Sequence, residues 1–79
     1  MPFVNVQHLA GAFTREQQLA IMEDIVAAVV RQGGEGIRPA TIVTITEVAD
    51  GLWSVGGQSL TMKEVERRRA ARAASSDKS

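Results

Sequence analysis

The first residue of this 79-residue chain that could do chemistry is Pro2, directly behind Met1. Initiator methionine is commonly trimmed when a small residue follows, and Pro2 would then expose a free secondary amine at the chain start. The structural alternative is that Pro2 begins an edge strand, because proline lacks a backbone N–H and loses no ladder bond there. The residue alone favours the structural alternative, so other features must decide.

Other reactive side chains are few. The sequence has one histidine, His8, and no cysteine, so histidine metal clusters, thiol chemistry and disulfides have no basis in it. It also lacks a P-loop and a glycine fingerprint behind a strand. We therefore expect no metal and no cofactor. His8 lies on the apolar face of its predicted strand, where we interpret it as a structural rather than a catalytic residue.

Charge is unevenly spread, although the formal net charge is zero. Residues 1–62 carry three basic against six acidic side chains, and residues 63–79 carry six basic against three acidic ones. The basic segment ERRRAAR lacks the aromatic residues that normally stack on nucleic-acid bases. We interpret it as a solvated helix face or a subunit contact, and do not expect a nucleic-acid partner. A small nucleic-acid-binding module remains an alternative.

A strand and a helix are predicted first along the chain. FVNVQHL alternates as a strand from about residue 3 to residue 9. The helix runs from about Arg15 to Gln32. It opens with Thr14 and Gln17 at capping-box spacing, and it closes at Gly33, which can take a left-handed cap conformation.

A second strand follows in ATIVTITEV, which is rich in β-branched residues. Strand, helix and strand make a βαβ unit with parallel strands and a right-handed crossover. One helix covers only one face of the sheet, and two strands are too few for an independent sheet. Because both sheet edges are also open to pairing, we expect an oligomer.

In the C-terminal third, the sequence predicts a short hairpin in GLWSVGGQSL and a final helix in TMKEVERRRAARAA. Thr61 and Glu64 have the spacing of a second capping box, and SSDKS is expected to fray. The predicted organisation is a βαβ domain over residues 1–60 and a basic helix with a frayed tail over residues 61–79. Trp53 either packs at an interface or lines a pocket.

No apolar run approaches the length of a membrane span, and the start lacks the basic-then-apolar order of a signal peptide. We therefore expect a cytoplasmic protein with no membrane partner.

Taken in register, these pieces resemble the 4-oxalocrotonate tautomerase family. The features that carry the resemblance are the proline behind methionine, the capped amphipathic helix, TIVTITE followed by VADG, and the aromatic residue and glycine pair of WSVGG. They run from Pro2 to about Leu60. The resemblance implies an α/β (α+β) protomer of β-α-β type that pairs into dimers, with the dimers assembled about a threefold, usually as hexamers.

The resemblance also implies a reaction. Pro2 would be the general base that moves a proton between the enol and keto forms of a small 2-oxo or 2-hydroxy acid. Burial of a secondary amine among apolar side chains disfavours its charged form, which lowers its pKa toward the operating pH. Trp53 falls where the family has an aromatic pocket residue, and would supply an apolar wall.

Two family arginines are missing. One normally comes just after the glycine that ends the first strand, where this chain reads Gly11-Ala12-Phe13-Thr14 and is one residue longer, and the other lies in the second strand, where it has Ile42. Arginine binds carboxylates bidentately and stabilises enolate charge, so these exchanges argue against the usual dicarboxylate substrate. Arg15, Arg38 or a tail arginine from a neighbouring subunit are the candidate substitutes.

Two hypotheses follow from these departures. The first is a keto-enol tautomerase, working as a homo-oligomer on a small enol or keto acid. The second is a non-catalytic or partner-dependent subunit of a tautomerase-like hetero-oligomer, in which a related subunit supplies the arginines.

Overall fold

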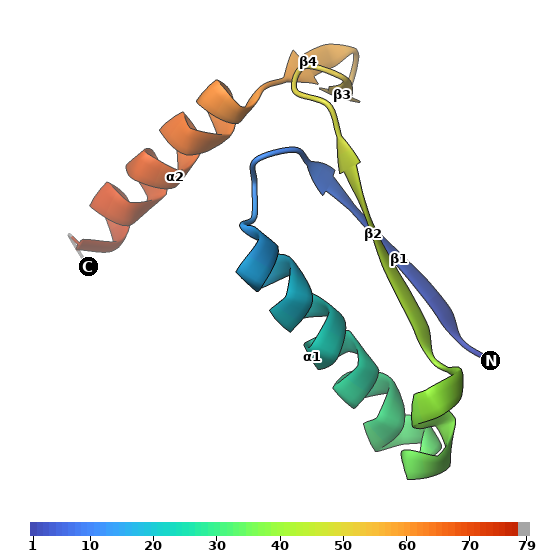
Figure 1. Ribbon diagram of the computed structural model, residues 1–79. Helices are drawn as coiled ribbons and strands as arrows, with labels where there is room; N and C mark the ends of the chain where they lie inside the picture. The colour runs from blue at the N-terminus through green and yellow to red at the C-terminus, as the bar shows by residue number, and fades with distance from the viewer. Residues whose placement is uncertain (78–79) are drawn as a thin grey trace. The chain divides into compact units, whose positions relative to one another are not determined.

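The computed structural model describes residues 1–77 and divides into two compact units. The first unit comprises Met1–His8 and Phe13–Glu47, and the second comprises Leu9–Ala12 and the chain from Val48 onward (Figure 1). Lys78 and Ser79, where the sequence predicts part of a frayed end, lie outside the described residues.

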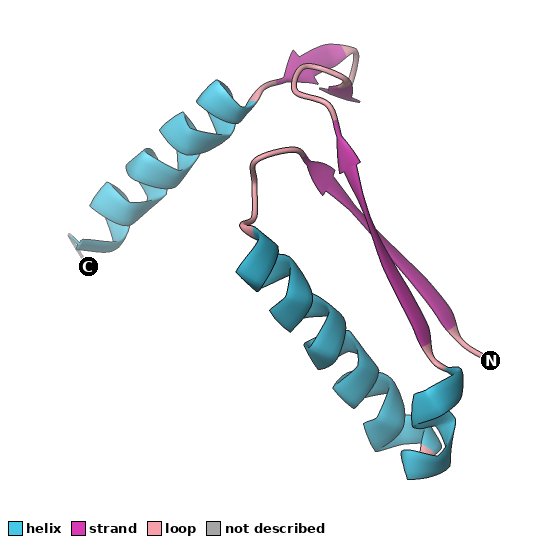
Figure 2. Cartoon of the chain, viewed as in Figure 1, coloured by secondary structure: helices cyan, strands magenta, loops and turns pink. Residues whose placement is uncertain are grey.

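A β-α-β arrangement forms the first unit (Figure 2). Its strands are β1 (Phe3–Leu9) and β2 (Ile42–Val48), whose last residues belong to the second unit, and its helix is α1 (Arg15–Gly33). The two strands are hydrogen-bonded neighbours and point the same way (Figure 1). At their start the Ile42 N–H donates to the Pro2 carbonyl at 3.0 Å. The predicted parallel βαβ unit is confirmed.

The two faces of this strand pair differ in burial, as the alternation of the sequence predicts. Val6 is half-buried and His8 is buried. On the exposed face Asn5 donates from Nδ2 to the hydroxyls of Thr44, at 2.7 Å, and Thr46, at 3.1 Å. Cross-strand hydrogen bonds of this kind fix the register of the pair.

Both ends of α1 are capped. The Thr14 hydroxyl accepts from the Gln17 N–H at 3.1 Å, and the Gln17 side chain accepts from the Thr14 N–H at 2.8 Å, so the predicted capping box is confirmed. The predicted C-terminal cap is wrong by one residue, because Gly33 is still helical and Gly34 is the cap, with φ at +90°. Ile37 packs where a Cβ on Gly33 would lie.

A six-residue 3₁₀ helix, η1 (Glu35–Ala40), joins α1 to β2 where the sequence predicts only a turn. It contains Pro39, and the Thr41 hydroxyl donates to the Ile37 carbonyl at 2.8 Å just beyond it. Short 3₁₀ segments of this kind are common connectors.

The second unit holds the predicted hairpin and the final helix. β3 (Trp53–Val55) pairs antiparallel with β4 (Gln58–Leu60), and α2 follows over Met62–Asp77. α2 therefore continues into the segment predicted to fray. The Thr61 hydroxyl accepts from the Glu64 N–H at 3.3 Å, which forms one half of the second predicted capping box. The Glu64 carboxylate instead accepts hydrogen bonds from Arg67 and Arg68.

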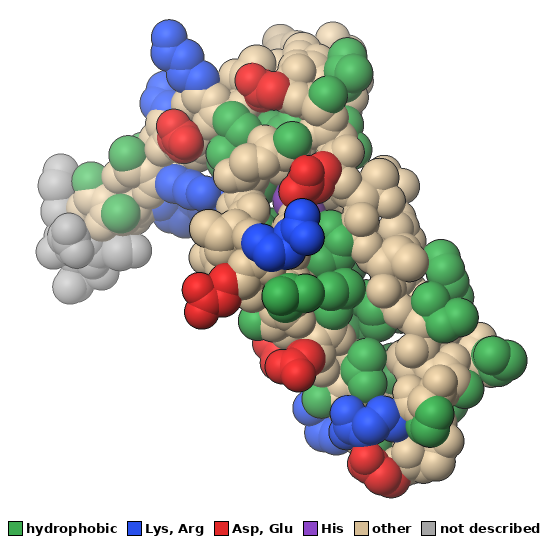
Figure 3. All heavy atoms as spheres, in the orientation of Figure 1, with side chains coloured by type: hydrophobic (Ala, Val, Ile, Leu, Met, Phe, Trp, Pro, Cys, Tyr) green, Lys and Arg blue, Asp and Glu red, His purple; other side chains and the backbone are tan. Residues whose placement is uncertain are grey.

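Little apolar surface is buried within one chain. Among the described residues Leu9, which is 5% exposed, is the one buried hydrophobic side chain, whereas Phe3 is 65% exposed. Figure 3 shows further hydrophobic side chains at the surface of the first unit. Within residues 1–77, no helix has the length and apolar character needed to cross a membrane.

Gly34 provides a test of the cap. We expect Gly34→Ala to destabilise the fold by about 1–3 kcal/mol, because side chains rarely adopt this backbone conformation. Gly36→Ala is the matched control, since Gly36 has no positive φ and a Cβ added there would meet no heavy atom within 4 Å. Urea unfolding of both variants at one protein concentration measures the difference. Equal midpoints would contradict this account of the cap.

Candidate functional site

Pro2 borders an open hollow of about 730 Å³ in the first unit. The other residues that line the hollow come from the chain start, the end of α1 and η1: Met1, Ala28, Val29, Gln32, Gly33 and Ile37. Pro2 is half-buried and Met1 is 92% exposed. While Met1 is attached, the Pro2 nitrogen is an amide, so this position offers a basic amine only after Met1 is removed.

Arg15 borders a different hollow of the first unit, with a volume of about 370 Å³. It is lined by residues of α1 and β2: Arg15, Gln18, Leu19, Met22, Ile45 and Glu47. The two hollows share no lining residue. The Arg15 hollow lies along the N-terminal half of α1 and the Pro2 hollow along its C-terminal end, and Arg15 is about 20 Å from Ala28 along the helix axis at ~1.5 Å per residue. A single chain therefore does not bring Arg15 to Pro2.

A buried polar group links α1 to both strands. Gln18 is 6% exposed, and its Nε2 donates to Glu47 Oε1 at 2.7 Å and lies 3.0 Å from His8 Nε2. An amide nitrogen only donates, so it pairs with a His8 tautomer whose Nε2 is the acceptor. The His8 ring also meets Phe13 edge-on, with centroids 4.9 Å apart. These contacts support the structural interpretation of His8.

The sequence analysis did not identify Gln18 as a buried polar residue, although its position along the helix indicates that it faces the core. Gln18 precedes Met22, Ile25 and Val29 at intervals of four, three and four residues, which is the spacing of one helix face. A polar residue at a core-facing position needs a hydrogen-bond partner. No group of three or more His, Cys, Asp or Glu side chains able to hold a metal ion occurs in the described part of the chain.

Arg38 is already paired. Its Nε donates to Glu35 Oε1 at 2.6 Å within η1, and both side chains are exposed. This hydrogen bond and the attraction of the two charges raise the pKa of Arg38 and lower the pKa of Glu35. An exposed ion pair of this kind contributes little to stability, so Arg38 could exchange Glu35 for another anion at small cost.

Trp53 belongs to the second unit. It opens β3, pairs with Leu60 across the hairpin and is half-buried. An indole in this position can pack against an apolar group while its N–H stays available as a donor.

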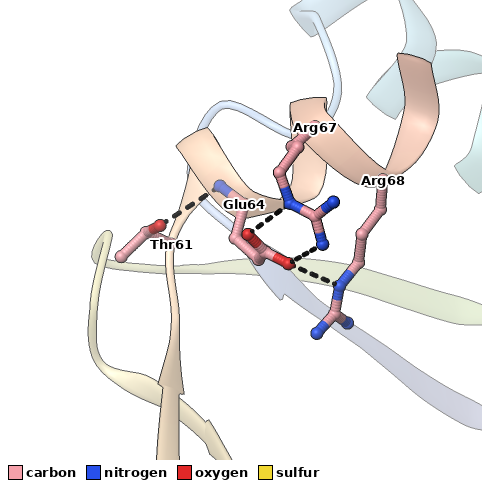
Figure 4. Close-up of polar contacts among 4 residues, drawn as sticks. All are labelled: Thr61, Glu64, Arg67 and Arg68. Atoms are coloured by element: carbon pink, nitrogen blue, oxygen red, sulfur yellow. Dashed lines mark hydrogen bonds and ion pairs between the residues drawn. The ribbon is translucent and has the colours of Figure 1, made fainter. Parts of the chain in front are cut away.

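The basic helix α2 is less cationic than its sequence suggests. The Glu64 carboxylate accepts from Arg67, at 2.6 and 2.9 Å, and from Arg68, at 3.1 Å (Figure 4). The hydrogen bond from Arg67, and less strongly that from Arg68, lowers the pKa of Glu64 to about 2. In addition, Arg69 Nη2 donates to the carbonyl of Ala12 at 2.9 Å.

Comparison with known proteins identifies the family. The family model described as "Tautomerase enzyme" matches residues 2–63. The chain belongs to the tautomerase family. It is 36% identical over 72 residues to "Probable tautomerase K2" of Dickeya dadantii (strain 3937), and this match covers 90% of the chain and 98% of the relative.

A solved structure gives the same result. This tautomerase superposes on a structure from work on the 4-oxalocrotonate tautomerase isozymes of Methylibium petroleiphilum with a TM-score of 0.65 and 26% identity. The likeness covers 81% of this chain and 97% of the other. The resemblance predicted from the sequence is confirmed, and the protein is a tautomerase-like isomerase. Most of α2 lies beyond the residues that the family model matches.

The Glu64 cluster of this tautomerase predicts a pH dependence. Because the pKa of Glu64 is lowered, its pairing stabilises α2 above the ordinary pKa of about 4.3, and the stabilisation is lost as the pH falls toward 2. The Glu64 carboxyl resonance, followed by NMR, should titrate near pH 2. In Arg67→Gln its midpoint should rise, and molar salt should raise it in the unmodified protein. A wild-type midpoint near 4.3 would contradict the pairing.

Proposed function

We propose that this protein is a keto-enol tautomerase that uses the amine of Pro2 as its general base. The substrate is a small 2-oxo or 2-hydroxy acid, and no cofactor takes part. The amine accepts the proton of the enol hydroxyl, and the resulting ammonium returns a proton to the carbon that becomes sp³. A base held beside the substrate, with a pKa near the operating pH, is the source of the rate enhancement in this proposal.

The observation that carries the proposal is the hollow beside Pro2. Its walls include Ala28, Val29 and Ile37, and an apolar wall disfavours the ammonium form of a secondary amine. The hydrogen bond between the Pro2 carbonyl and the Ile42 N–H fixes the direction of the residue. Because Met1 is almost fully exposed, it is accessible to removal.

We propose that the two candidate cations, Arg15 and Arg38, come from different copies of the chain. Arg15 lies 13 residues before Ala28, the first residue of α1 that lines the Pro2 hollow, which is about 20 Å along the helix axis at ~1.5 Å per residue, so we propose that it serves that hollow from a second copy. Arg38 is one residue from Ile37, which lines the hollow, and would bind substrate by exchanging its Glu35 partner. We propose Arg15 and Arg38 as carboxylate-binding residues and Trp53 as the apolar wall.

A non-catalytic or partner-dependent subunit is the second candidate function. The observation in its favour is that Ala12 and Ile42 stand where better-known family members have arginine. In that case a related subunit supplies the missing cations. Nucleic-acid binding is not proposed, because Arg67 and Arg68 already share the Glu64 carboxylate, which cancels one of their two charges.

Assembly is the first prediction of this proposal. We expect at least a dimer, because one helix leaves the second sheet face and the sheet edges in water, and the family resemblance implies a hexamer. Sedimentation velocity at micromolar concentration measures the state. Phe3→Glu puts a charge on the uncovered face and should shift the population to smaller species. A folded wild-type monomer would refute the assembly.

The role of Pro2 is the second prediction. Pro2→Ala keeps a terminal amine but loses the ring that directs it, so ketonisation of a small enol acid should slow, within the ~10²–10⁴-fold range of general-base contributions. A form that retains Met1 should show no turnover, since its Pro2 nitrogen is an amide. Intact mass establishes whether Met1 is present in each preparation.

Circular dichroism and light scattering must show that fold and assembly survive in each form. The acidic limb of the pH–rate curve should report the pKa of the free amine. Equal rates in wild type, Pro2→Ala and the Met1-retaining form would leave Pro2 as a strand start and favour the non-catalytic subunit.

A further inference from the structure

We infer that the hollow beside Arg15 binds a free α-amino acid with an apolar side chain. The hollow has a volume of about 370 Å³, which is within the size range of small-molecule sites. Its lining residues all belong to the first unit, and none of them lines the Pro2 hollow. The inference therefore goes beyond the proposed function, and binding here does not require the amine of Pro2.

Two opposite charges line the hollow without pairing with each other. Arg15 begins α1, and Glu47 lies near the end of β2. Both residues are exposed, and in the part of the chain that the structure describes neither of them forms an ion pair. A guanidinium and a carboxylate that line one hollow but stay apart favour a ligand that carries both charges.

A buried amide adds a third polar group. Gln18 is 6% exposed, and its Nε2 is held by Glu47 Oε1 at 2.7 Å and His8 Nε2 at 3.0 Å. Within the described residues its Oε1 forms no hydrogen bond. Every fully buried side-chain nitrogen or oxygen of those residues has a partner. Gln18 Oε1 is therefore open to solvent on the side where Gln18 lines the hollow, as an acceptor fixed by the bonds of its own amide nitrogen.

These polar groups match the two charged groups of an amino acid. An ammonium ion has three donors, and the hollow offers it two acceptors: Gln18 Oε1, and Glu47 Oε2, since Gln18 donates to Oε1 of that carboxylate. The carboxylate of the ligand matches the planar fork of Arg15 through two parallel hydrogen bonds. An α-amino acid carries both groups on one carbon, so one small molecule supplies both partners.

The other lining residues are apolar. Leu19 and Met22 come from α1 and Ile45 from β2. Leu19 is 52% exposed, and the other two are half-buried. Figure 3 shows hydrophobic side chains next to basic and acidic ones on the face of the first unit that is in view. Because covering exposed apolar surface favours binding, we expect a branched apolar side chain on the amino acid.

The test titrates the protein with L-leucine and with two probes that each keep one of its charges, 3-methylbutylamine and 4-methylpentanoate. L-leucine should shift the side-chain amide resonances of Gln18 and leave those of Asn5, on the exposed face of the strand pair, in place. Each single-charge probe should bind about 10- to 100-fold more weakly, the range for hydrogen bonds to charged groups. An unshifted Gln18 amide, or equal affinity for all three probes, would overturn the inference.

Matched variants test the carboxylate end of the ligand. Arg15→Gln should weaken L-leucine binding about 10- to 100-fold and should not weaken the binding of 3-methylbutylamine. Arg31→Gln removes an exposed cation from the other end of α1, outside the hollow, and should bind L-leucine as wild type does. Equal losses in the two variants would mean a general charge effect and would contradict the site.

A second pair of variants tests the ammonium end. Glu47→Gln keeps an acceptor for Gln18 but loses the charge, so it should weaken L-leucine and 3-methylbutylamine and should not weaken 4-methylpentanoate. Glu23→Gln removes an exposed acid of α1 that does not line the hollow and is the control. Circular dichroism must show that each variant is folded. The three-probe comparison needs wild type alone, so it decides the question even where a variant does not fold.

Occupancy of this site has a consequence for the proposed function, in which Arg15 serves the Pro2 hollow of a second copy. A guanidinium that holds an amino acid is not available there, so L-leucine should raise the apparent KM for a small enol acid. Binding without an effect on KM would leave the site in place and remove Arg15 from the proposed function. The Met1-retaining form has no catalytic amine and should still bind L-leucine. Normal turnover without any binding would overturn the inference and leave the proposed function standing.

Discussion

The parallel pairing of β1 with β2 is the constraint on which the first unit depends. Parallel strands cannot be joined by a tight turn, so the chain must return along the sheet, and α1 with η1 makes that return. The return brings the end of α1 back to the start of β1, where Pro2 lies. Without the crossover, Pro2 would have no apolar wall.

The same constraint leaves the protein short of a core. A single crossover helix covers one face of two strands, and the opposite face carries the Asn5 contacts to two threonines together with exposed Phe3. A chain of this size gains stability from association more readily than from its own interior. The shortage of burial is therefore the physical reason to expect assembly, and the proposed function uses the same assembly to bring Arg15 from another copy.

Sequence reasoning was most accurate where the determining contacts are local. The Thr14–Gln17 box, the alternation in β1 and β2 and the hairpin each depend on residues a few positions apart, and all are present in the structure. The exact cap was missed, because two glycines stand side by side and the spacing alone does not say which of them takes the positive φ that Gly34 has. Gln18 and Arg69 were missed as functional or structural contacts, because their partners are distant in sequence. The assignments of Pro2, Trp53, Arg15 and Arg38 to one site came from family likeness rather than from spacing.

The contact between Arg69 and residue 12 has an evolutionary consequence. Its acceptor is a backbone carbonyl, which every amino acid supplies. Residue 12 can therefore change without breaking the contact, and the two positions are free to vary independently. Pairwise covariation between them would be absent even where the contact is preserved, so a search for coupled substitutions would pass over it.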